Sequence, residues 1–319
     1  MSKTQIPQLQ TSVQSQTHSQ DDAIDLRELA NAIWKGKLLI LGVTLVFVLG
    51  SVFYALLIPN EYKSTAILSP ASTSSSSSLS NLAGRFGGLA SLAGVNLGGA
   101  SGGNKTTIAI ALIKTWGFLE TFIKNNQLEV EVFATKGWSK TNNKLLIDKT
   151  LYDEENTKWV LGGGGEAGVL GPTSWELFGH IKDRINISQN LNTGLITLSV
   201  EHYSPFVAKK WVDLLIIAIN QHMQLQDRVE ALNSIEYLKE QINKTNISEM
   251  RTIFYQLIEE QTKTLMLAEI SSEYVFKTLS PSKIAEQKSK PKRALIVVLG
   301  LIFGLVFSMV VVLVRFFIK

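Results

Sequence analysis

The chain has 319 residues, of which 45% are hydrophobic, a formal net charge of +4 and no cysteine. This length is enough for one or two domains with a hydrophobic core. The lack of cysteine excludes disulfide bonds, thiolate metal sites and a cysteine nucleophile. The small positive charge is spread along the chain and gives no argument for nucleic-acid binding, so we expect no nucleic-acid partner.

The N-terminal part, residues 1–37, is predicted to be a tail followed by a short surface helix. Residues 1–20 are rich in Gln, Ser and Thr, which is typical of a disordered segment. Residues 21–37 place apolar side chains at helical spacing after an acidic start, which predicts an amphipathic helix on a membrane surface. Trp34, Lys35 and Lys37 are suited to anchor that helix at the membrane–water interface.

Two uncharged apolar stretches, residues 38–58 and 294–314, stand apart from the rest of the chain. Each has the roughly 20 residues that a helix needs to cross a hydrocarbon core of about 30 Å. We therefore predict two transmembrane helices. The first is not expected to be a cleaved signal peptide, because its apolar run is too long and no small-x-small cleavage site follows it. Residues 315–319 are predicted to be a short tail.

Residues 59–293 are predicted to form one water-soluble α/β domain. Residues 61–68 have the composition of a strand, whereas residues 70–103 are a low-complexity run of Ser, Gly, Ala and Leu. Apolar residues over 106–126 trace one face of a helix. Period-two alternation around Asn192-Thr193-Gly194 predicts a β-hairpin over residues 184–201. Residues 129–172 give no clear pattern, except that a glycine-rich run from 162 to 171 predicts a loop.

The longest predicted element begins at Ser204, the expected N-cap, with Pro205 at the first helical position. Helical periodicity to about Asn243 gives a helix of about 60 Å. A break at 245–248 and a second helix over 250–268 predict a hairpin within residues 204–270, with a returning strand at 273–279. The predicted fold is an α/β membrane-proximal domain with a long protruding helical hairpin, bracketed by two transmembrane helices.

The sequence contains no recognisable catalytic constellation, so we predict no enzyme activity, no cofactor and no metal. The four histidines are isolated, and no HExxH pair or GxSxG nucleophile elbow occurs. The segment 98–107 (GGASGGNKTT) resembles a phosphate-binding loop. However, Asn104 stands where a glycine should precede Lys105, and no buried-type strand leads into it.

Signals for helix packing and assembly are present instead. Gly300, Gly304 and Ser308 place small side chains on one face of the second predicted span, which allows another helix to approach closely. Gly42 and Gly50 are candidates for the same role on the first span. The helix around residues 211–219 is apolar on all sides, which favours burial against other elements or other copies of the chain.

Charge alone leaves the membrane orientation open. Arg27, Lys35 and Lys37 before the first span, and Arg315 and Lys319 after the second, favour cytoplasmic termini. The basic cluster over residues 283–293 favours the opposite orientation, but the rule weakens for long loops.

Four stretches resemble the chain length determinant (Wzz-type polysaccharide co-polymerase) family of bacterial surface polysaccharide synthesis. They are residues 24–29 (IDLREL); 89–94 (LASLAG) with 116–123 (WGFLETFI); 201–211 (EHYSPFVAKKW) with Asn220 and 237–238; and 254–259 (FYQLIE) through 273–274, Pro281 and 291–293 (PKR). Each stretch is short, and the resemblance rests on their order between two terminal spans.

This resemblance implies an inner-membrane protein with cytoplasmic termini, a periplasmic main domain and ring-shaped homo-oligomers. It implies a non-enzymatic role in setting the modal length of O-antigen or a related polymer, with a Wzy-type polymerase and lipid-linked polysaccharide as partners. It also assigns Pro281, Pro291, Lys292 and Arg293 to the tether that returns to the membrane, although this tether has less proline than the family's.

Other functions stay open at this point. A two-pass sensor would need a cytoplasmic output domain, and only five residues follow position 314. For the same reason we do not expect the tyrosine-kinase domain that some capsule-type relatives carry. An export adaptor for capsule or exopolysaccharide would act on export rather than on length, and an enzyme of unrecognised type would need titratable residues close together in a pocket.

Overall fold

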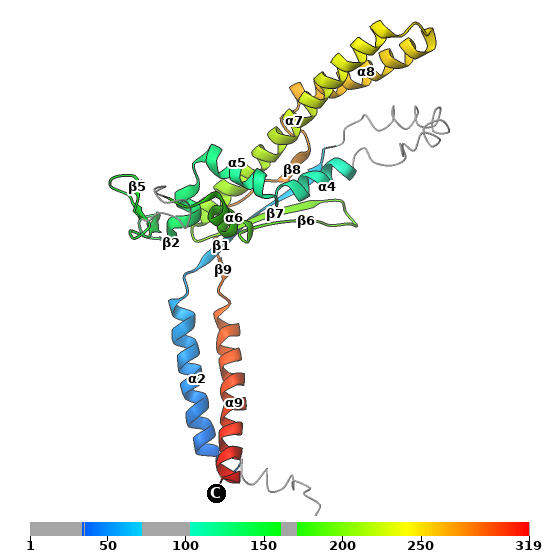
Figure 1. The fold of residues 1–319 in the computed structure, drawn as a ribbon. Helices are drawn as coiled ribbons and strands as arrows, with labels where there is room; N and C mark the ends of the chain where they lie inside the picture. The colour runs from blue at the N-terminus through cyan, green and yellow to red at the C-terminus, as the bar shows by residue number, and fades with distance from the viewer. Residues whose placement is uncertain (1–33, 35, 72–102, 161–170, 319) are drawn as a thin grey trace, which may run out of the picture. The chain divides into compact units, whose positions relative to one another are not determined.

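The computed structural model describes residues 34, 36–71, 103–160 and 171–318, and its fold is shown in Figure 1. The chain divides into two compact units, one formed by its two ends and one by Leu57–Lys292. The predicted tail and most of the predicted amphipathic helix fall outside the described residues. So do nearly all of the Ser- and Gly-rich segment and most of the glycine-rich run.

The first unit consists of two apolar helices, α2 (Lys37–Leu57) and α9 (Arg293–Phe317). Their mean hydropathies are 2.5 and 3.1, and both are long enough to cross a membrane. Most of their large apolar side chains are exposed, as expected for helices whose solvent is lipid. The two predicted apolar helices are therefore confirmed, with ends within three residues of the predicted ones.

The second unit is built on a five-stranded antiparallel sheet. Its main path has the order β6 (Ile185–Gln189), β7 (Ile196–His202), β1 (Glu61–Pro70), β8 (Phe276–Ser280), and β9 (Lys288–Lys290) pairs with the start of β1. Alternate residues of β1 are buried, so one face of the strand packs on the core. The predicted strand at 61–68 and the predicted hairpin are confirmed, and the returning strand begins at Phe276 rather than at residue 273.

Three helices supply most of the helical side chains of one hydrophobic core that packs on this sheet. They are α5 (Trp116–Asn126), α6 (Ser174–Lys182) and the first half of α7 (Pro205–Lys244). Trp211, Leu215 and Ile219 of α7 are completely buried. These residues recur every four positions, so one side of the helix is buried and apolar. Ile217 lies on another side of the helix and is 52% exposed.

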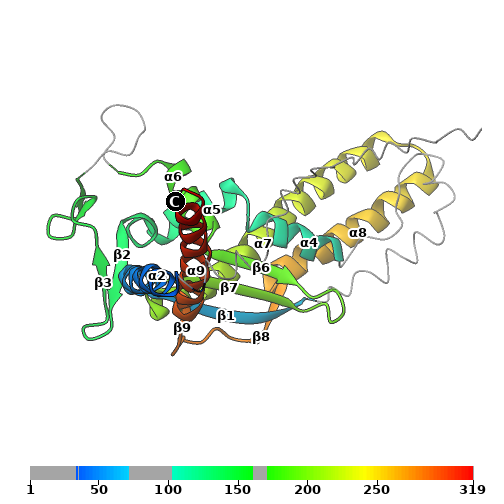
Figure 2. The same ribbon diagram turned by 90° about the horizontal axis from the view of Figure 1, so that it is seen from below.

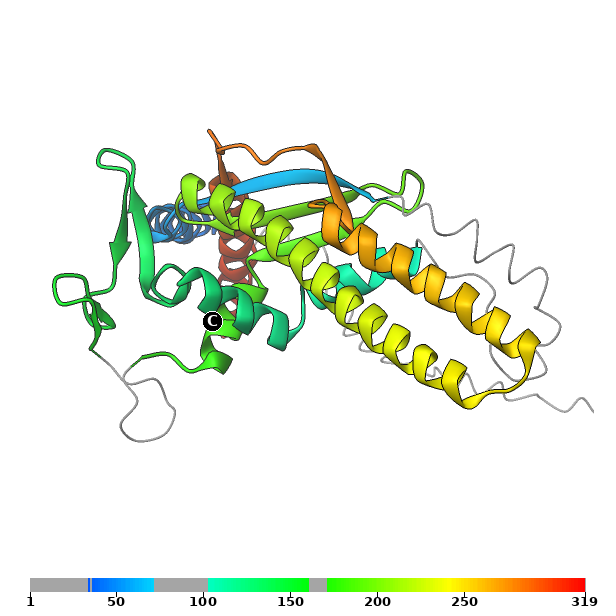
Figure 3. The same cartoon turned by 90° about the horizontal axis from the view of Figure 1, so that it is seen from above.

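The α7–α8 hairpin extends beyond the sheet, as Figure 3 shows in yellow-green and orange. Helix α7 has 40 residues, which corresponds to about 60 Å, and α8 (Ser248–Ile270) folds back along it. The predicted helical hairpin is confirmed. Ser204 occupies the predicted N-cap position but its hydroxyl makes no capping hydrogen bond. Instead its backbone N–H donates to the ring of His202.

The helix predicted over 106–126 is wrong as a single element. The structure has α4 (Gly103–Leu112) and α5 (Trp116–Asn126), which meet at a bend of 67°. The backbone N–H groups of Lys114 and Thr115 donate to carbonyls only three residues earlier, and the Thr115 hydroxyl also donates to Leu112 O. This tight turn ends α4 and lets both helices place apolar side chains in the core.

The region that the sequence left unassigned contains short elements. Val130–Ala134 is a single π-helical turn, and two small hairpins follow it. The first hairpin pairs β2 (Thr135–Ser139) with β3 (Lys144–Ile147), and the second pairs β4 (Tyr152–Asp153) with β5 (Lys158–Trp159). Such short strands carry too few residues for a periodicity to be visible.

Candidate assembly surfaces and the tether

The small residues of α9 face α2 of the same chain. A Cβ atom placed on Gly300 would lie 2.5 Å from Ser51 Cβ, and one on Gly304 would lie 2.9 Å from Phe47 Cβ. Ser308 is completely buried, and its hydroxyl donates to Leu305 O within α9. Close approach of two helix backbones through small residues is a common way of packing helices in a bilayer.

Gly42 and Gly50 on α2 differ from this set. A Cβ atom on either glycine would meet nothing within 4 Å. The contact between the two helices therefore does not use them. Their role in packing stays a prediction, and it would require a helix from outside this chain.

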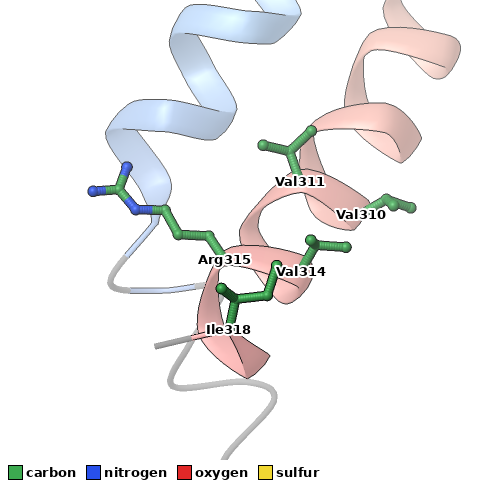
Figure 4. Close-up of a pocket in the computed structure, with 5 residues that line it drawn as sticks. All are labelled: Val310, Val311, Val314, Arg315 and Ile318. Carbon is green, nitrogen blue, oxygen red and sulfur yellow. The ribbon is translucent and has the colours of Figure 1, made fainter.

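The lower end of α9 has an apolar recess lined by Val310, Val311 and Val314, together with Arg315 and Ile318 (Figure 4). The side chain of Arg315 points toward α2 in this view. Three valines and an isoleucine give the recess no set of polar groups that would fix a ligand's orientation. A cationic side chain near a helix end is typical of an anchor at the membrane–water interface.

The tether from Pro281 onward lies along the sheet rather than hanging free. The Ser282 hydroxyl donates to the carboxylate of Asp213 in α7 at 2.5 Å, and the Ser64 hydroxyl donates to Lys283 O at 2.8 Å. These bonds attach the beginning of the tether to both α7 and β1. Pro281 is the last position before this attachment.

The end of the tether returns to the strand that follows the first span. In β9, Lys290 pairs with Glu61 in register, and its ammonium lies 2.5 Å from a carboxylate oxygen of Glu201. The hydrogen bond to Glu201 raises the pKa of Lys290, and Ser289 donates to the same carboxylate. Pro291 and Lys292 follow directly. In the other unit, Arg293 Nε donates to Ala55 O at 3.1 Å.

The hairpin is held to the base by Asn220, a buried amide in the middle of α7. Its side-chain oxygen accepts from the backbone N–H of both Val275 and Phe276, and its nitrogen donates to Phe276 O. These bonds attach the chain that returns from α8 to α7. A polar residue in an apolar helix face is the signal for such a contact, but its partner cannot be read from the sequence.

A second attachment joins three segments through Asp227. Its carboxylate oxygen lies 2.5 Å from Lys105 Nζ in α4 and accepts a hydrogen bond from the Tyr274 hydroxyl at 2.6 Å. Burial and this hydrogen bond raise the pKa of Tyr274, so its hydroxyl keeps its proton at neutral pH. Sequence analysis missed Asp227 because its partners are 122 and 47 residues away.

A buried polar cluster surrounds His202 at the end of β7. Its Nδ1 accepts from the Ser204 N–H and its Nε2 lies 3.2 Å from Glu131 O. The Glu131 carboxylate accepts from Trp211 Nε1 at 2.8 Å and pairs with Lys210 at 2.7 Å. Burial lowers the pKa of His202 to about 3, so the imidazole is neutral.

A stripe of exposed apolar side chains runs along α7. Ile217, Leu225, Val229 and Leu232 are each between 46% and 61% exposed. Their spacing places them on one side of the helix. Beside them, a groove of about 410 Å³ lies between α5 and α7 and is lined mainly by apolar and amide side chains, including Asn125 and Gln221. Charged groups are absent from the lining of this groove among the described residues.

The described residues contain no group of three metal-ligating side chains. His180 lies against Phe133 and His222 against Phe118, both in edge-to-face ring contacts. Of the phosphate-loop-like segment, residues 103–107 lie in the first turns of helix α4. The polar contacts described above connect distant segments of the chain. The described residues form an α/β unit with a long helical hairpin, together with two helices that are long and apolar enough to cross a membrane.

Two protein-family models match parts of this chain. Residues 22–125 match the model of the chain length determinant protein family (Wzz), and residues 244–317 match the model of the G-rich domain on putative tyrosine kinase (GNVR). The resemblance to the chain length determinant family that was seen in the sequence is therefore confirmed over residues 22–125. The search of curated proteins found no match.

Among solved structures, the chain is similar to a full-length bacterial polysaccharide co-polymerase, with 13% identity and a TM-score of 0.38 over 91% of this chain and 97% of the other. It is also similar to a fragment of WzzB, a polysaccharide co-polymerase from Salmonella Typhimurium, with 11% identity and a TM-score of 0.29 over 72% and 100%. Both scores are too low to carry an argument, so the assignment rests on the family models.

Proposed function

We propose that this protein is a non-catalytic regulator of the modal chain length of O-antigen or a related surface polysaccharide. The observation that carries the proposal is the chain length determinant match over residues 22–125, combined with two apolar helices that bracket one large domain. The partners would be a Wzy-type polymerase and its lipid-linked polymer. The protein would lie in the bacterial inner membrane, with cytoplasmic termini and the domain Leu57–Lys292 in the periplasm.

The proposed working form is a ring-shaped homo-oligomer. The exposed stripe on α7 supports this, because neighbouring copies would bury apolar side chains that are otherwise in water. A ring of hairpins would hold polymerase or growing polymer for a set number of additions. No catalytic group of the chain takes part in this scheme, because the polymerase would supply the chemistry.

A second candidate is a role in capsule or exopolysaccharide production. The match to the G-rich domain over residues 244–317 favours it, because that domain is described on putative tyrosine kinases. The two candidate functions differ in which polysaccharide should change when the gene is deleted. We find no specific observation that favours a two-pass sensor.

The test is a gel of surface polysaccharides from cells with and without this gene. The proposal predicts that deletion replaces a clustered band pattern with a broad distribution biased to short chains, and that the gene restores the clusters. Unchanged bands with a lower total amount of capsule would instead support the second candidate. Unchanged polysaccharides of both kinds would contradict both.

A further inference from the structure

The β2–β3 hairpin is rich in basic residues. Its strands and turn, with the two residues after β3, contain Lys136, Lys140, Lys144 and Lys149 against one acidic residue, Asp148. Lys136 pairs with Asp148 at 2.8 Å and lowers the pKa of that carboxyl to about 2. Lys140 and Lys144 are exposed, and neither has an ion-pair partner among the described residues.

This hairpin is attached to the strand that follows the first span. The rings of Trp138 and Tyr62 are 5.5 Å apart in an edge-to-face contact, and Phe206 adds a third ring 6.2 Å from Trp138. Trp138 Nε1 also donates to Asn143 in the turn, so the tryptophan fixes both the turn and its contact with β1.

The short stretch of chain between the first span and Tyr62 limits how far Tyr62 can lie from the end of that span. Helix α2 ends at Leu57, and a fully extended chain covers at most about 3.6 Å per residue. Tyr62 can therefore lie at most roughly 18 Å along the chain from the end of the span. Trp138 contacts Tyr62, so while this contact holds the hairpin is connected to the span through the same short stretch of chain.

The exposed surface of the hairpin and its neighbour combines cationic and apolar side chains. Leu146 is 52% exposed and lies opposite Gly137 in the register, and Phe206 is 44% exposed. Lysines next to exposed apolar and aromatic side chains are typical of surfaces at the membrane–water interface. The β4–β5 hairpin carries the acidic residues Glu154 and Glu155. Figure 2 shows β2 and β3 on the side of the sheet away from the α7–α8 hairpin.

We propose that the β2–β3 hairpin docks on anionic phospholipid headgroups of the bilayer in which the chain is anchored. Lys140, Lys144 and Lys149 supply the attraction, and the exposed side chains of Leu146 and Phe206 supply the apolar contact at the interface. The consequence is an attachment of the second unit to the bilayer, in addition to the two spans, that fixes the tilt of this unit. This inference does not depend on the regulated polymer or on oligomer formation.

The test uses the full chain in lipid nanodiscs and exploits the absence of native cysteine. A nitroxide label on N142C, in the turn of the hairpin, reports its collision rate with an aqueous nickel chelate. Each lysine near an anionic surface raises surface occupancy by roughly fivefold, so three lysines give roughly a hundredfold preference for the docked state. We expect the nickel collision rate to fall severalfold when neutral phosphatidylcholine discs are replaced by discs containing phosphatidylglycerol.

Replacing the lysines by glutamate tests whether the label is shielded because the hairpin binds lipid headgroups or only because it lies near the bilayer. K140E/K144E/K149E should restore the collision rate seen in neutral discs. The matched variant K114E/K158E/K239E, which reverses three exposed lysines elsewhere, should not. Unfolding midpoints of both variants check that the fold is kept. Equal collision rates in neutral and anionic discs, or rates that are insensitive to K140E/K144E/K149E, would overturn the proposal. Loss of length control with intact docking would bear only on the proposed function.

Discussion

Asn220 and Phe276 exchange two hydrogen bonds, because the Phe276 N–H donates to the Asn220 side-chain oxygen at 2.9 Å and the Asn220 amide nitrogen donates to Phe276 O at 3.1 Å. Asn220 is only 2% exposed and Phe276 is completely buried. The pair joins the middle of α7 to the first residue of β8, which follows the helical hairpin. Asn220 thus connects the helical hairpin to the sheet at the point where the chain returns, in addition to the contact between Asp227 and Tyr274.

Asn220→Ala should destabilise the second unit. It leaves three buried backbone groups without their side-chain partner, at a cost of roughly 2–4 kcal/mol. Urea unfolding of the full chain in detergent, followed by near-ultraviolet circular dichroism, measures the loss. Asn233→Ala, at an exposed position further along α7, is the control and should change stability by less than about 0.5 kcal/mol. Equal stability of the two variants would contradict this role.

Acid should weaken the fold through His202. Its folded pKa of about 3 lies below the ordinary value of 6.5, so the unfolded chain binds the proton more readily. The stabilising effect of the neutral imidazole is complete above pH 6.5 and is lost as the pH falls toward 3. From pH 7 to pH 5 we expect a loss of about 2 kcal/mol, measured as the change in urea midpoint.

Several groups that face His202 influence its pKa. The Glu131 carbonyl and the Ser204 N–H occupy its two ring nitrogens, while Arg184 and Lys210 disfavour its charged form. His202→Asn removes the titration, and this variant should be less stable at pH 7 but lose less stability on going to pH 5. A pH dependence in the variant equal to that of the native protein would assign the effect to other groups.

Gly304→Leu should separate the two spans of one chain. A Cβ atom at this position would already lie 3.2 Å from Thr44 Cα, and a leucine side chain needs more space. A cysteine pair at Phe47 and Phe307, whose rings are 5.5 Å apart, reports the contact by oxidative cross-linking. We expect several times less intrachain cross-link with Gly304→Leu.

Gly42→Leu serves as the matched control for the spans, because the space around its Cβ position is open. It should leave the intrachain cross-link unchanged. The size of the detergent-solubilised oligomer is measured on the same samples, since Gly300, Gly304 and Ser308 are also predicted to affect assembly. Undiminished cross-linking in Gly304→Leu would show that the small residues do not set the distance between these helices.

Two charges on the exposed stripe of α7 should prevent assembly. Leu225→Glu with Val229→Glu places carboxylates where the ring model buries apolar surface, and we expect at least a tenfold weaker association. Mass measurement of the protein in nanodiscs or mild detergent gives the subunit number. Leu191→Glu is the control and should assemble normally, because Leu191 lies in the β6–β7 turn and is 92% exposed. Oligomers of native size from the α7 variant would contradict an interface at this stripe.

Long periodic elements were predictable from the sequence, and contacts between distant segments were not. The two apolar helices and α7 each extend over 20 or more residues, so their periodicity and length are clear. The prediction of a single helix over 106–126 was wrong. Apolar residues keep helical spacing on both sides of Thr115, but the helical backbone is interrupted there. The break depends on local hydrogen bonds that leave no mark on the hydrophobic pattern.

In the candidate sites, too, local patterns were predictable from the sequence and contacts between distant segments were not. Gly300 and Gly304 were visible as a pattern, but nothing in the sequence says that their neighbour is α2 of the same chain. Asp227 joins residues from α4 and from the segment after α8, and such a cluster forms only once the sheet has brought these segments together. The basic hairpin at 135–149 gave no strand signal because its strands have only four and five residues.

The most direct test of the central claim is the chain-length distribution of surface polysaccharide in a deletion strain that carries either the native gene or the Leu225→Glu/Val229→Glu variant. Leu191→Glu is the control, and all proteins are expressed at equal levels in the membrane. The account predicts that the native and Leu191→Glu proteins restore one narrow modal length, and that the α7 variant gives a broad distribution biased to short chains. A narrow modal length restored by a variant that does not assemble would contradict the view that an oligomeric scaffold sets the length.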